Sequence, residues 1–297
     1  MWVQKYFFFI YPASFCKEFF KLFPLLCEKA EYSHKMNTFA QLHQNKFFEE
    51  MTDYQCEKIL PYRSSSKGKK EQVEQMFDAI AEKYDPMNRL MSLGNDRLWR
   101  KKAILSLKEL NPQKILDIAT GTGDFAITAY HLLSPEKITG IDISEGMLKI
   151  GQQKIEKLNL TDRIVLQVGD STELDFDSQT FDAVTVAFGV RNFESLSKGL
   201  CEMYRVLKVG GVAVILELSE PQNAFLKFGY KLYAKLVIPV FAWFISNDSC
   251  AYNYLPQSIE AFPQGKKMKV LLYKCGFSKV EVKTFTFGSC SFYRAVK

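Results

Sequence analysis

The sequence lacks the residue groupings on which several classes of protein depend. Its seven cysteines form no CxxC pair, and its three histidines, His34, His43 and His131, do not complete a zinc set with them. We therefore predict no metal site and no disulfide framework, and a reduced compartment, the cytoplasm, fits this cysteine usage best. A Ser-His or Cys-His hydrolase would have to be built around one of these few histidines.

Long uncharged runs and concentrated positive charge are missing as well. Two of the longest uncharged runs, residues 6–16 and 236–247, contain 11 and 12 residues, and each is interrupted by a proline. A helix that spans a bilayer needs about 20 apolar residues, so neither run is predicted to span one. The net charge is +6, but residues 1–70 carry 11 Lys and Arg against 7 Asp and Glu, which leaves +2 for the rest. No Arg-rich stripe follows, and no nucleic-acid partner is expected.

The first 70 residues differ in composition from the rest of the chain. They are dense in aromatic residues and close on the polar run RSSSKGKK, residues 63–70, which is typical of a linker. Three interpretations stay open: a translation start assigned too early, with Met36 or Met51 as the true start, an aromatic anchor in a membrane interface, or an unusual signal sequence. We expect an extension over residues 1–70 and a catalytic domain over residues 71–297.

From Lys114 onward, short β-rich runs alternate with helical segments. The predicted strands are residues 114–119, 137–143, 163–170, 181–189 and 210–218, and the predicted helices are residues 124–133, 145–158 and 195–207. This alternation is typical of an α/β protein with a doubly wound, mostly parallel sheet. Two last strands, residues 279–287 and 291–297, adjoin through Gly288 and Ser289 and predict an antiparallel pair at one edge.

Two helices are predicted before the sheet. One helical face is formed by Val73, Met76, Phe77, Ile80 and Tyr84. This helix is predicted to end at Asp85 because Pro86 follows, and a second helix is predicted over residues 96–107. We expect both to cap the edge formed by the carboxyl ends of the strands, where ligands bind in open α/β sheets.

The stretch ILDIATGTGDFAI, residues 115–127, predicts a nucleotide-type cofactor and is compatible with two. Gly121 and Gly123 fit the dinucleotide fingerprint, whereas the acid-led pattern DxxxGxGD is typical of S-adenosylmethionine sites. Asp124 stands at the start of the following helix, where it would repel the pyrophosphate of a dinucleotide. Asp117 and Asp124 instead suit the sulfonium and ammonium cations of S-adenosyl-L-methionine.

Further candidate cofactor residues follow from the same pattern. Gly121 and Gly123 let the backbone pass close to a ligand, and Thr122 offers a hydroxyl and an N–H in that turn. Asp142 ends the second strand, where a carboxylate accepts hydrogen bonds from two ribose hydroxyls. Asp170 and Ser171 end the third strand, with a carboxylate for the adenine amino group and an N–H for a ring nitrogen. Together these residues favour S-adenosylmethionine over NAD.

Three blocks of the chain closely resemble the ubiquinone/menaquinone biosynthesis C-methyltransferase family. They are KYDPMNRLMSLGNDRLWRK (83–101), FDAVTVAFGVRNF (181–193) and ISNDSCAYNYLPQSIEAFP (245–263), within a resemblance that covers residues 72–293. The resemblance implies the class I S-adenosylmethionine-dependent methyltransferase fold. It also implies methylation of a ring carbon of a polyprenyl quinol, either demethylmenaquinol or a methoxy-polyprenyl-benzoquinol.

Carried over by position, the family's cofactor contacts fall on Thr122, Asp142, Asp170 and Ser171. The chain departs from the family pattern in two turns. It has LDF at residues 174–176 where LPF is common, and Val209 where the family has proline. These departures concern local loop shape and leave the assignment intact.

The implied chemistry needs a quinol oxygen that loses its proton and pushes charge onto the neighbouring ring carbon. We predict that Arg191 binds this oxygen and stabilises its charge, because a guanidinium stays cationic at neutral pH. Asn192 is predicted to orient the ring, and Tyr84 and Asp85 to reach its opposite side, with Asp85 as a candidate proton acceptor. Simple packing is the alternative for Tyr84, and a turn-forming role is the alternative for Arg191 and Asn192.

Residues 225–245 predict an amphipathic helix with Lys227, Lys231 and Lys235 on one face. The helix either packs on the sheet or houses the prenyl tail and contacts the bilayer peripherally, at the inner face of the cytoplasmic membrane. A homodimer is a further candidate assembly.

Other functions stay open at this point. They are methylation of another phenol or a sterol, a non-catalytic cofactor-binding partner, and a nicotinamide oxidoreductase. The quinol interpretation requires that the blocks FGVRN and LPQSIEAFP line one cavity.

Overall fold

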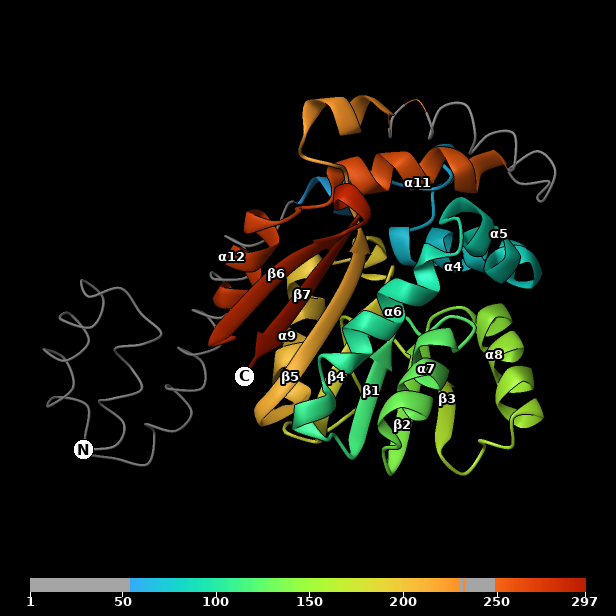
Figure 1. Cartoon of the computed structure of the whole chain (residues 1–297). Helices are drawn as coiled ribbons and strands as arrows, with labels where there is room; N and C mark the ends of the chain where they lie inside the picture. The colour runs from blue at the N-terminus through green and yellow to red at the C-terminus, as the bar shows by residue number, and fades with distance from the viewer. Residues whose placement is uncertain (1–53, 230–231, 233–248) are drawn as a thin grey trace, which may run out of the picture. The chain divides into compact units, whose positions relative to one another are not determined.

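The computed structural model describes residues 54–229, 232 and 249–297, which lie in one compact unit, residues 53–297. A seven-stranded sheet has the order β3-β2-β1-β4-β5-β7-β6 (Figure 1). The strands are β1 (Lys114–Ile118), β2 (Lys137–Asp142), β3 (Ile164–Val168), β4 (Phe181–Ala187), β5 (Leu207–Leu218), β6 (Lys279–Phe285) and β7 (Cys290–Val296). Strands β1 to β5 are parallel, and β7 runs antiparallel to both β5 and β6. The predicted doubly wound sheet with an antiparallel edge pair is confirmed.

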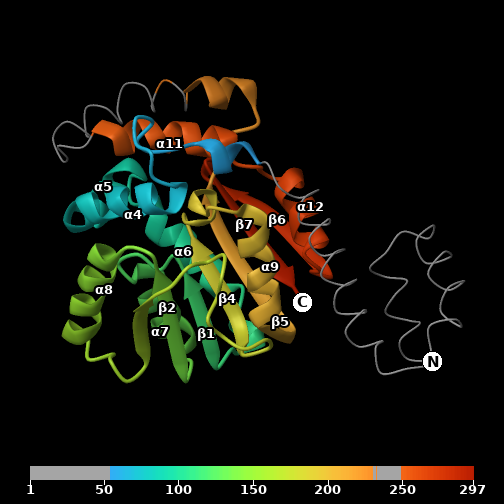
Figure 2. The same cartoon turned by 180° about the vertical axis from the view of Figure 1, so that it is seen from behind.

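Helices cover both faces of the sheet, which explains why its central strands are apolar throughout. Helices α6 (Asn95–Leu105) and α7 (Asp124–Leu133) pack together on one face (Figure 1), and α9 (Leu196–Val206) and α12 (Lys266–Lys274) pack on the opposite face (Figure 2). Helix α8 (Glu145–Lys157) packs against β2 and β3. It begins as predicted, because the Ser144 hydroxyl accepts a hydrogen bond from the Met147 N–H at 3.1 Å.

The cap consists of α4 (Lys69–Ile80), α5 (Tyr84–Met91) and α11 (Ser249–Ala261), which lie across the carboxyl ends of the parallel strands (Figures 1 and 2). Its own apolar core is formed by Val73, Met76, Ile80, Ala81, Met87, Met147 and Tyr254. The predicted placement is confirmed for the first of the two predicted cap helices. It is wrong for the second, because α6 packs against α7 and β5 on a face of the sheet. The cap gains α11 from the far end of the chain.

The predicted end of the first cap helix is wrong. The α-helix ends at Ile80, a short 3-10 segment covers Ala81–Lys83, and α5 then starts at Tyr84 with Pro86 inside its first turn. Proline is tolerated there because the first N–H groups of a helix have no partner within the helix. Pro86 thus accompanies the start of a helix and not the end of one.

The compact unit also begins earlier than the boundary expected at residue 70. Cys56 and Lys69 are buried, and Glu57 Oε1 accepts a hydrogen bond from the Leu196 N–H at 2.7 Å. The polar run of residues 63–70 therefore leads into the first cap helix. Residues 1–53 of the predicted extension 1–70, and most of the predicted helix 225–245, lie outside the described residues. Among the helices that the structure describes, none combines the length and apolarity needed to cross a bilayer.

Candidate active site

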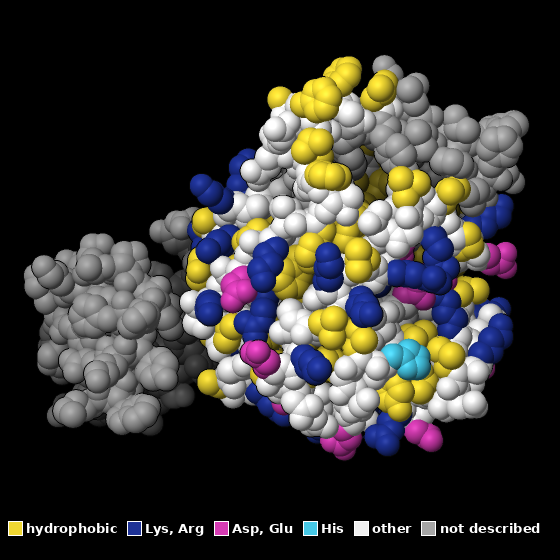
Figure 3. Space-filling model, in the orientation of Figure 1, with side chains coloured by type: hydrophobic (Ala, Val, Ile, Leu, Met, Phe, Trp, Pro, Cys, Tyr) yellow, Lys and Arg dark blue, Asp and Glu magenta, His cyan; other side chains and the backbone are white. Residues whose placement is uncertain are grey.

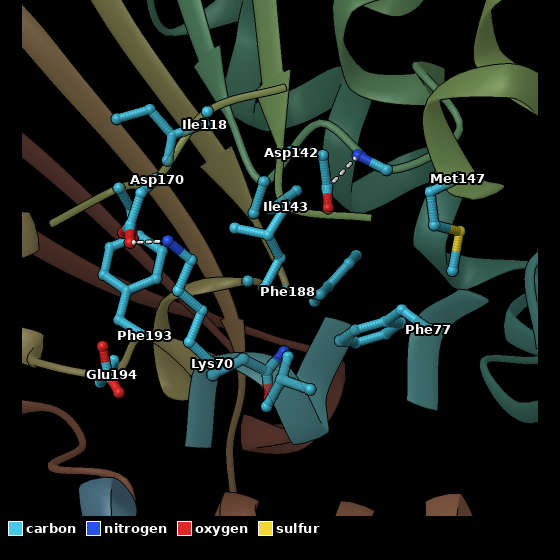
Figure 4. A pocket seen from close by; sticks show the side chains of 18 of the residues that line it. Lys70, Phe77, Ile118, Asp142, Ile143, Met147, Asp170, Phe188, Phe193 and Glu194 are labelled. Atoms are coloured by element: carbon cyan, nitrogen blue, oxygen red, sulfur yellow. Dashed lines mark hydrogen bonds and ion pairs between the residues drawn. The ribbon is translucent and has the colours of Figure 1, made fainter. Parts of the chain in front are cut away.

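A first cavity lies between the carboxyl ends of β1 to β4 and the cap (Figure 4). We refer to it as the strand-end cavity. Apolar side chains from α4 and α8 form part of its wall, among them Val73, Phe77 and Met147. It brings together six of the residues predicted for the site: Tyr84, Gly121, Asp142, Asp170, Ser171 and Asn192.

Two tight turns, one after β1 and one after β4, line this cavity. After β1 the chain passes through Ala119 and Gly121 at φ values of 51° and 57°, and after β4 it passes through Phe188 at 62°. No atom lies within 4 Å of the position that a Cβ on Gly121 would take, so a side chain there would stand in open space beside the cavity. A Cβ on Gly189 would lie 2.4 Å from the Ala119 Cβ, which shows how closely the two turns approach. Positive φ values at Ala119 and Phe188 store strain of the kind found at functional sites.

Asp142 is held by backbone groups at the end of β2. Its Oδ2 accepts a hydrogen bond from the Gly121 N–H at 2.8 Å, and its Oδ1 accepts one from the Ser144 N–H at 3.0 Å. Burial raises the pKa of this carboxyl, and the N–H groups of Ser144 and Gly121 work against that rise. The glycine turn and Asp142 therefore position one another.

Asp170, after β3, is paired with a cation from the cap. Its Oδ2 lies 2.7 Å from Lys70 Nζ, and its Oδ1 accepts hydrogen bonds from the N–H and the hydroxyl of Thr172, both at 2.8 Å. Burial opposes the charge, but the hydrogen bonds from Lys70 and Thr172 lower the pKa of Asp170 overall. Figure 4 shows this pair at one end of the cavity and Asp142 bonded to the glycine turn.

Four other predicted site residues, Asp85, Thr122, Gly123 and Asp124, do not line the strand-end cavity. Thr122 Oγ1 donates to Asp85 Oδ1 at 2.6 Å, and Lys154 Nζ lies 2.5 Å from Asp85 Oδ2 and 2.6 Å from Asp124 Oδ1. Gly123, at φ 79°, precedes α7 next to this cluster. Because α5 starts at Tyr84, the Asp85 carboxylate is directed to Thr122 and Lys154, away from the position expected of a proton acceptor. The charge of Asp124 is likewise balanced within the protein by Lys154.

Asp117 is also buried away from the cavity, and 1% of its surface is exposed. Its two oxygens accept hydrogen bonds from the hydroxyls of Thr120 at 2.7 Å and Thr185 at 2.6 Å. Burial raises the pKa of Asp117 to about 6, although both hydroxyls work against this. The carboxylate thus ties the end of β1 to β4 and does not face the space where a cationic ligand was expected.

A second cavity of about 260 Å³ adjoins the first, and we refer to it as the apolar cavity. Its walls come from the cap, from α6, from the turn after β4 and from the turn between β6 and β7. Most of the lining is hydrophobic: Met76, Ile80, Met87, Met91, Trp99, Leu218, Leu255 and Ile259. Phe77, Tyr84 and Phe188 line both cavities, so ligands in the two would meet at these rings.

The apolar cavity joins the two sequence blocks on which the quinol interpretation depends. Phe188 and Arg191 come from FGVRN, and Leu255, Pro256 and Ile259 come from the LPQSIEAFP block. The two blocks therefore line one cavity, as that interpretation requires.

Arg191 lies in the wall of the apolar cavity within a buried network. Its Nη1 is 2.7 Å from Glu217 Oε1 and also donates to the Phe188 carbonyl, and its Nε donates to Ser258 Oγ at 3.3 Å. Among the hydrogen bonds of the described residues none uses Nη2, which keeps a donor for a ligand. Glu217 is fully buried in β5 and keeps the guanidinium paired. The sequence signal for Glu217 is a lone acid within the apolar strand VAVILEL.

Two side chains from the cap, Tyr254 and Lys69, hold the turn that contains Arg191 and Asn192 in place. Tyr254 of α11 donates its hydroxyl to Asn192 Oδ1 at 3.0 Å. Lys69 Nζ donates to the carbonyls of Cys56 at 2.7 Å, Phe193 at 3.0 Å and Arg191 at 3.2 Å. Burial lowers the pKa of Lys69 to about 8. Lys69 was not predicted because it lies within the polar run of residues 63–70, although it stands four residues before Val73 on the buried face of α4.

Comparisons with known proteins show what the chain is similar to. The model of the ubiE/COQ5 methyltransferase family matches residues 65–297. The demethylmenaquinone methyltransferase of Bacteroides fragilis is 54% identical over 245 residues, 82% of this chain and 100% of that protein. The demethylmenaquinone methyltransferase of Porphyromonas gingivalis is 46% identical and covers 81% of this chain and 98% of its own. The ubiquinone/menaquinone biosynthesis C-methyltransferase of Geobacter sulfurreducens is 40% identical, covering 82% and 95%.

Solved structures support the fold alone. A putative O-methyltransferase from Nostoc punctiforme superposes with a TM-score of 0.58 at 16% identity, covering 79% of this chain and 64% of its own. A possible histamine N-methyltransferase from Thermotoga maritima superposes with a TM-score of 0.52 at 17% identity, covering 76% and 99%. The class I methyltransferase fold predicted from the sequence is confirmed.

Proposed function

The chain belongs to the ubiE/COQ5 methyltransferase family, and from this premise we propose that it methylates a ring carbon of demethylmenaquinol to give menaquinol. It is a methyltransferase whose methyl donor is S-adenosylmethionine, as the sequence predicted. The observation that carries the proposed substrate is the apolar cavity. Among its described lining residues Arg191 alone carries a guanidinium, and the cavity meets the strand-end cavity at three aromatic rings.

The residues of the strand-end cavity fit S-adenosylmethionine, which when bound supplies an electrophilic methyl group on a sulfonium. Each oxygen of Asp142 accepts one backbone hydrogen bond and retains acceptor capacity for the ribose hydroxyls. Asp170 and Ser171 supply polar groups for the adenine edge, and Ile143 and Met147 supply apolar surface. Of the residues predicted for the cofactor, we retain Gly121, Asp142, Asp170 and Ser171 as direct contacts.

In the proposed reaction a quinol hydroxyl gives its proton to solvent, and charge moves onto the ring carbon. That carbon would form the new bond to the methyl group as the methyl–sulfur bond breaks, and would then lose its own hydrogen as a proton, which restores the aromatic quinol. Arg191 Nη2 donates a hydrogen bond to the developing oxyanion in a site from which water is largely excluded. Tyr84, which lines both cavities, and Asn192, which lines the strand-end cavity, hold the ring against the methyl donor. Burial raises the pKa of the Tyr84 phenol, opposed by the charges of Arg100 and Arg191, so we assign Tyr84 an orienting role as a neutral phenol.

The test is an anaerobic assay of the purified full chain with labelled S-adenosylmethionine. We expect methylation of demethylmenaquinol, with a kcat/KM at least about tenfold higher than for a methoxy-polyprenyl-benzoquinol, an advantage of about 1.4 kcal/mol. The benzoquinol is the second candidate substrate, because the Geobacter sulfurreducens relative is named for both pathways. A simple phenol without a tail is the control. Transfer to the phenol and to neither quinol contradicts the proposal.

We also propose that the chain acts as a peripheral protein at the inner face of the cytoplasmic membrane, where a polyprenyl quinol resides. Phe225 and Phe228, before the undescribed segment, are 84% and 70% exposed, and Figure 3 shows hydrophobic side chains gathered at this end of the molecule. Flotation with anionic liposomes tests the contact, and Phe225→Asp with Phe228→Asp is expected to abolish it. A homodimer stays a prediction that light scattering in solution tests.

A further inference from the structure

A second buried ion pair lies in the wall of the apolar cavity, on the side of α6. Arg100 Nη1 is 2.7 Å from Asp96 Oδ2, and the two side chains are 9% and 6% exposed. Ser92 Oγ donates to Asp96 Oδ1 at 2.8 Å. Asp96 itself lines the cavity, and among the described lining residues it alone carries a carboxylate. Neither cofactor binding nor stabilisation of an oxyanion explains an anion at this position.

Both buried ion pairs contact Phe188, which lines both cavities. The Arg100 guanidinium lies over the Phe188 ring, 5.2 Å from its centroid, while Arg191 Nη1 donates to the Phe188 carbonyl. Asp96, through its partner Arg100, and Arg191 directly are thus linked to the residue at which the two cavities adjoin. The other titratable side chains of the lining are Tyr84 of α5 and Tyr254 of α11.

The two ion pairs differ in what they offer a ligand. A carboxylate only accepts hydrogen bonds, and each Asp96 oxygen has capacity beyond the one donor it already receives. Arg191 only donates. A quinol presents two hydroxyls, which donate and accept, whereas the oxidised quinone presents two carbonyls, which only accept. Arg191 thus suits both redox forms, and Asp96 suits only the reduced one.

We propose that Asp96 makes the apolar cavity selective for the quinol over its quinone, by accepting a hydrogen bond from one ring hydroxyl while Arg191 binds the other oxygen. This inference rests on the proposed function. A quinone carbonyl against the buried carboxylate leaves two acceptors facing each other, and a site built to bind an O–H rejects the analogue without it. The quinone has no nucleophilic ring carbon, so its exclusion keeps an unreactive molecule out of the site.

A merely structural role for Asp96 predicts a different outcome. The pair joins residues four apart on α6, and an acid in the first turn stabilises a helix through its dipole. Loss of such a role lowers stability and affects both redox forms of the ring alike. Redox selectivity is therefore the readout that separates the two roles.

The experiment measures, in the full chain under anaerobic conditions, the KM of demethylmenaquinol and the inhibition constant of oxidised demethylmenaquinone. In the wild type we expect the quinone to bind at least about 30-fold more weakly than the quinol. In Asp96→Asn we expect this ratio to fall at least about tenfold, because the amide donates to a quinone carbonyl. The affinity for S-adenosylmethionine, measured by calorimetry, stays within about twofold of the wild type, well under the tenfold that 1.4 kcal/mol represents.

A matched control is Glu202→Gln, which removes the carboxylate of the Glu202–Arg205 pair on α9, 2.6 Å apart and remote from both cavities. Its selectivity ratio is expected to equal that of the wild type. Because Asp96→Asn leaves Arg100 buried without its anion, the double variant Asp96→Asn with Arg100→Gln removes both charges and serves if the single variant does not fold.

An unchanged selectivity ratio in the folded single or double variant overturns the inference while leaving the proposed function intact. Failure of the wild type to methylate either quinol overturns both. A ratio that falls in the Asp96 variants and not in Glu202→Gln supports the assignment of Asp96.

Discussion

The strand-end cavity and the apolar cavity lie side by side and are built in opposite ways. In the strand-end cavity, the polar groups Gly121, Asp142, Asp170 and Ser171 each stand within a few residues of the end of a strand. In the apolar cavity, Tyr84, Asp96, Arg191 and Ile259 come from four elements that are far apart in the chain. The polar groups of the strand-end cavity are thus supplied by short segments that follow the strands. The apolar cavity is formed only where the cap packs over the sheet.

This difference extends to how charge is handled. Asp142 is satisfied by two backbone N–H groups, which the end of a β-strand and the following turn supply automatically. Arg191 and Asp96 are satisfied by partners from side chains, Glu217 and Arg100. A buried side-chain pair is costly to break from one side, because the partner then remains charged in a site of low polarity. Substitutions in the apolar cavity should therefore disturb folding and turnover together, and those in the strand-end cavity chiefly cofactor binding.

The largest expected effect is that of Arg191→Ala. Turnover of quinol should fall by about 10²- to 10³-fold through loss of the oxyanion donor, and the free energy of unfolding by about 3–5 kcal/mol because Glu217 is left buried and unpaired. Steady-state kinetics and urea unfolding measure the two effects. The double variant with Glu217→Gln should regain stability without regaining turnover. Turnover within threefold of the wild type would remove Arg191 from the mechanism.

Asp142→Ala should weaken binding of S-adenosylmethionine by about 10- to 100-fold, because charged hydrogen bonds to the ligand are lost. The KM for quinol should stay unchanged, which calorimetry and kinetics together establish. Asp182→Ala is the matched control, since Asp182 Oδ2 also accepts two backbone N–H groups, from Gln113 and Lys114 at 2.9 and 2.8 Å, at the opposite edge of the sheet. Equal loss of cofactor affinity in both variants would refute a direct role for Asp142.

Asp117→Asn should alter the pH dependence of stability more than cofactor binding. The pKa of Asp117 in the folded chain is about 6 against an ordinary 3.8, so its contribution is fully present below pH 3.8 and is lost as the pH rises through 6. The wild type should lose up to about 3 kcal/mol over this range that the variant does not lose. Thermal unfolding between pH 4 and 7 measures this. A tenfold loss of cofactor affinity in Asp117→Asn would instead indicate that Asp117 contributes to cofactor binding.

Asp124→Asn should have the smallest effect. Its ion pair with Lys154 is more than a quarter exposed on both sides, and such pairs contribute about 0–1 kcal/mol. Cofactor affinity should change by less than about twofold, because Lys154 already balances the charge that the sequence analysis assigned to the sulfonium. Calorimetry with S-adenosylmethionine decides the point. A loss of cofactor affinity well beyond that range would show that Asp124 acts on the ligand across the turn.

Much of the fold was accessible from the sequence because its signals are local. Alternation of β-rich runs with helical segments predicted five strands, the two runs that adjoin through Gly288 and Ser289 predicted the last two, and Ser144 marked the start of α8. Pro86 misled the prediction, because proline is compatible with both the end of one helix and the first turn of the next. The polar composition of residues 63–70 led to the prediction of a linker, but a polar residue such as Lys69 can be buried when carbonyl groups accept its hydrogen bonds.

The site residues also differ in whether a local sequence signal could predict them. The glycine turn, Asp142 and Asp170 were predicted because each follows a strand directly, and parallel strands bring their carboxyl ends to one edge. Asp117, Thr122 and Asp85 were also predicted, but position along the chain does not reveal which way a side chain points. The partners Glu217, Tyr254 and Lys69 lie 26, 62 and 122 residues from Arg191 or Asn192, beyond the reach of any local pattern.

The sequence by itself determined the family, the sheet and the cofactor, because periodicity, strand-end acids and motif blocks are properties of contiguous residues. Only the tertiary structure decided which acids line a cavity and which are bonded instead to threonine, lysine or arginine side chains. It also decided that Asp96 and Arg191 line the same apolar cavity. The reason is physical. Whether a buried charge is available depends on the groups packed around it, and for Asp85, Asp124 and Arg191 those groups come from elements far apart in the chain.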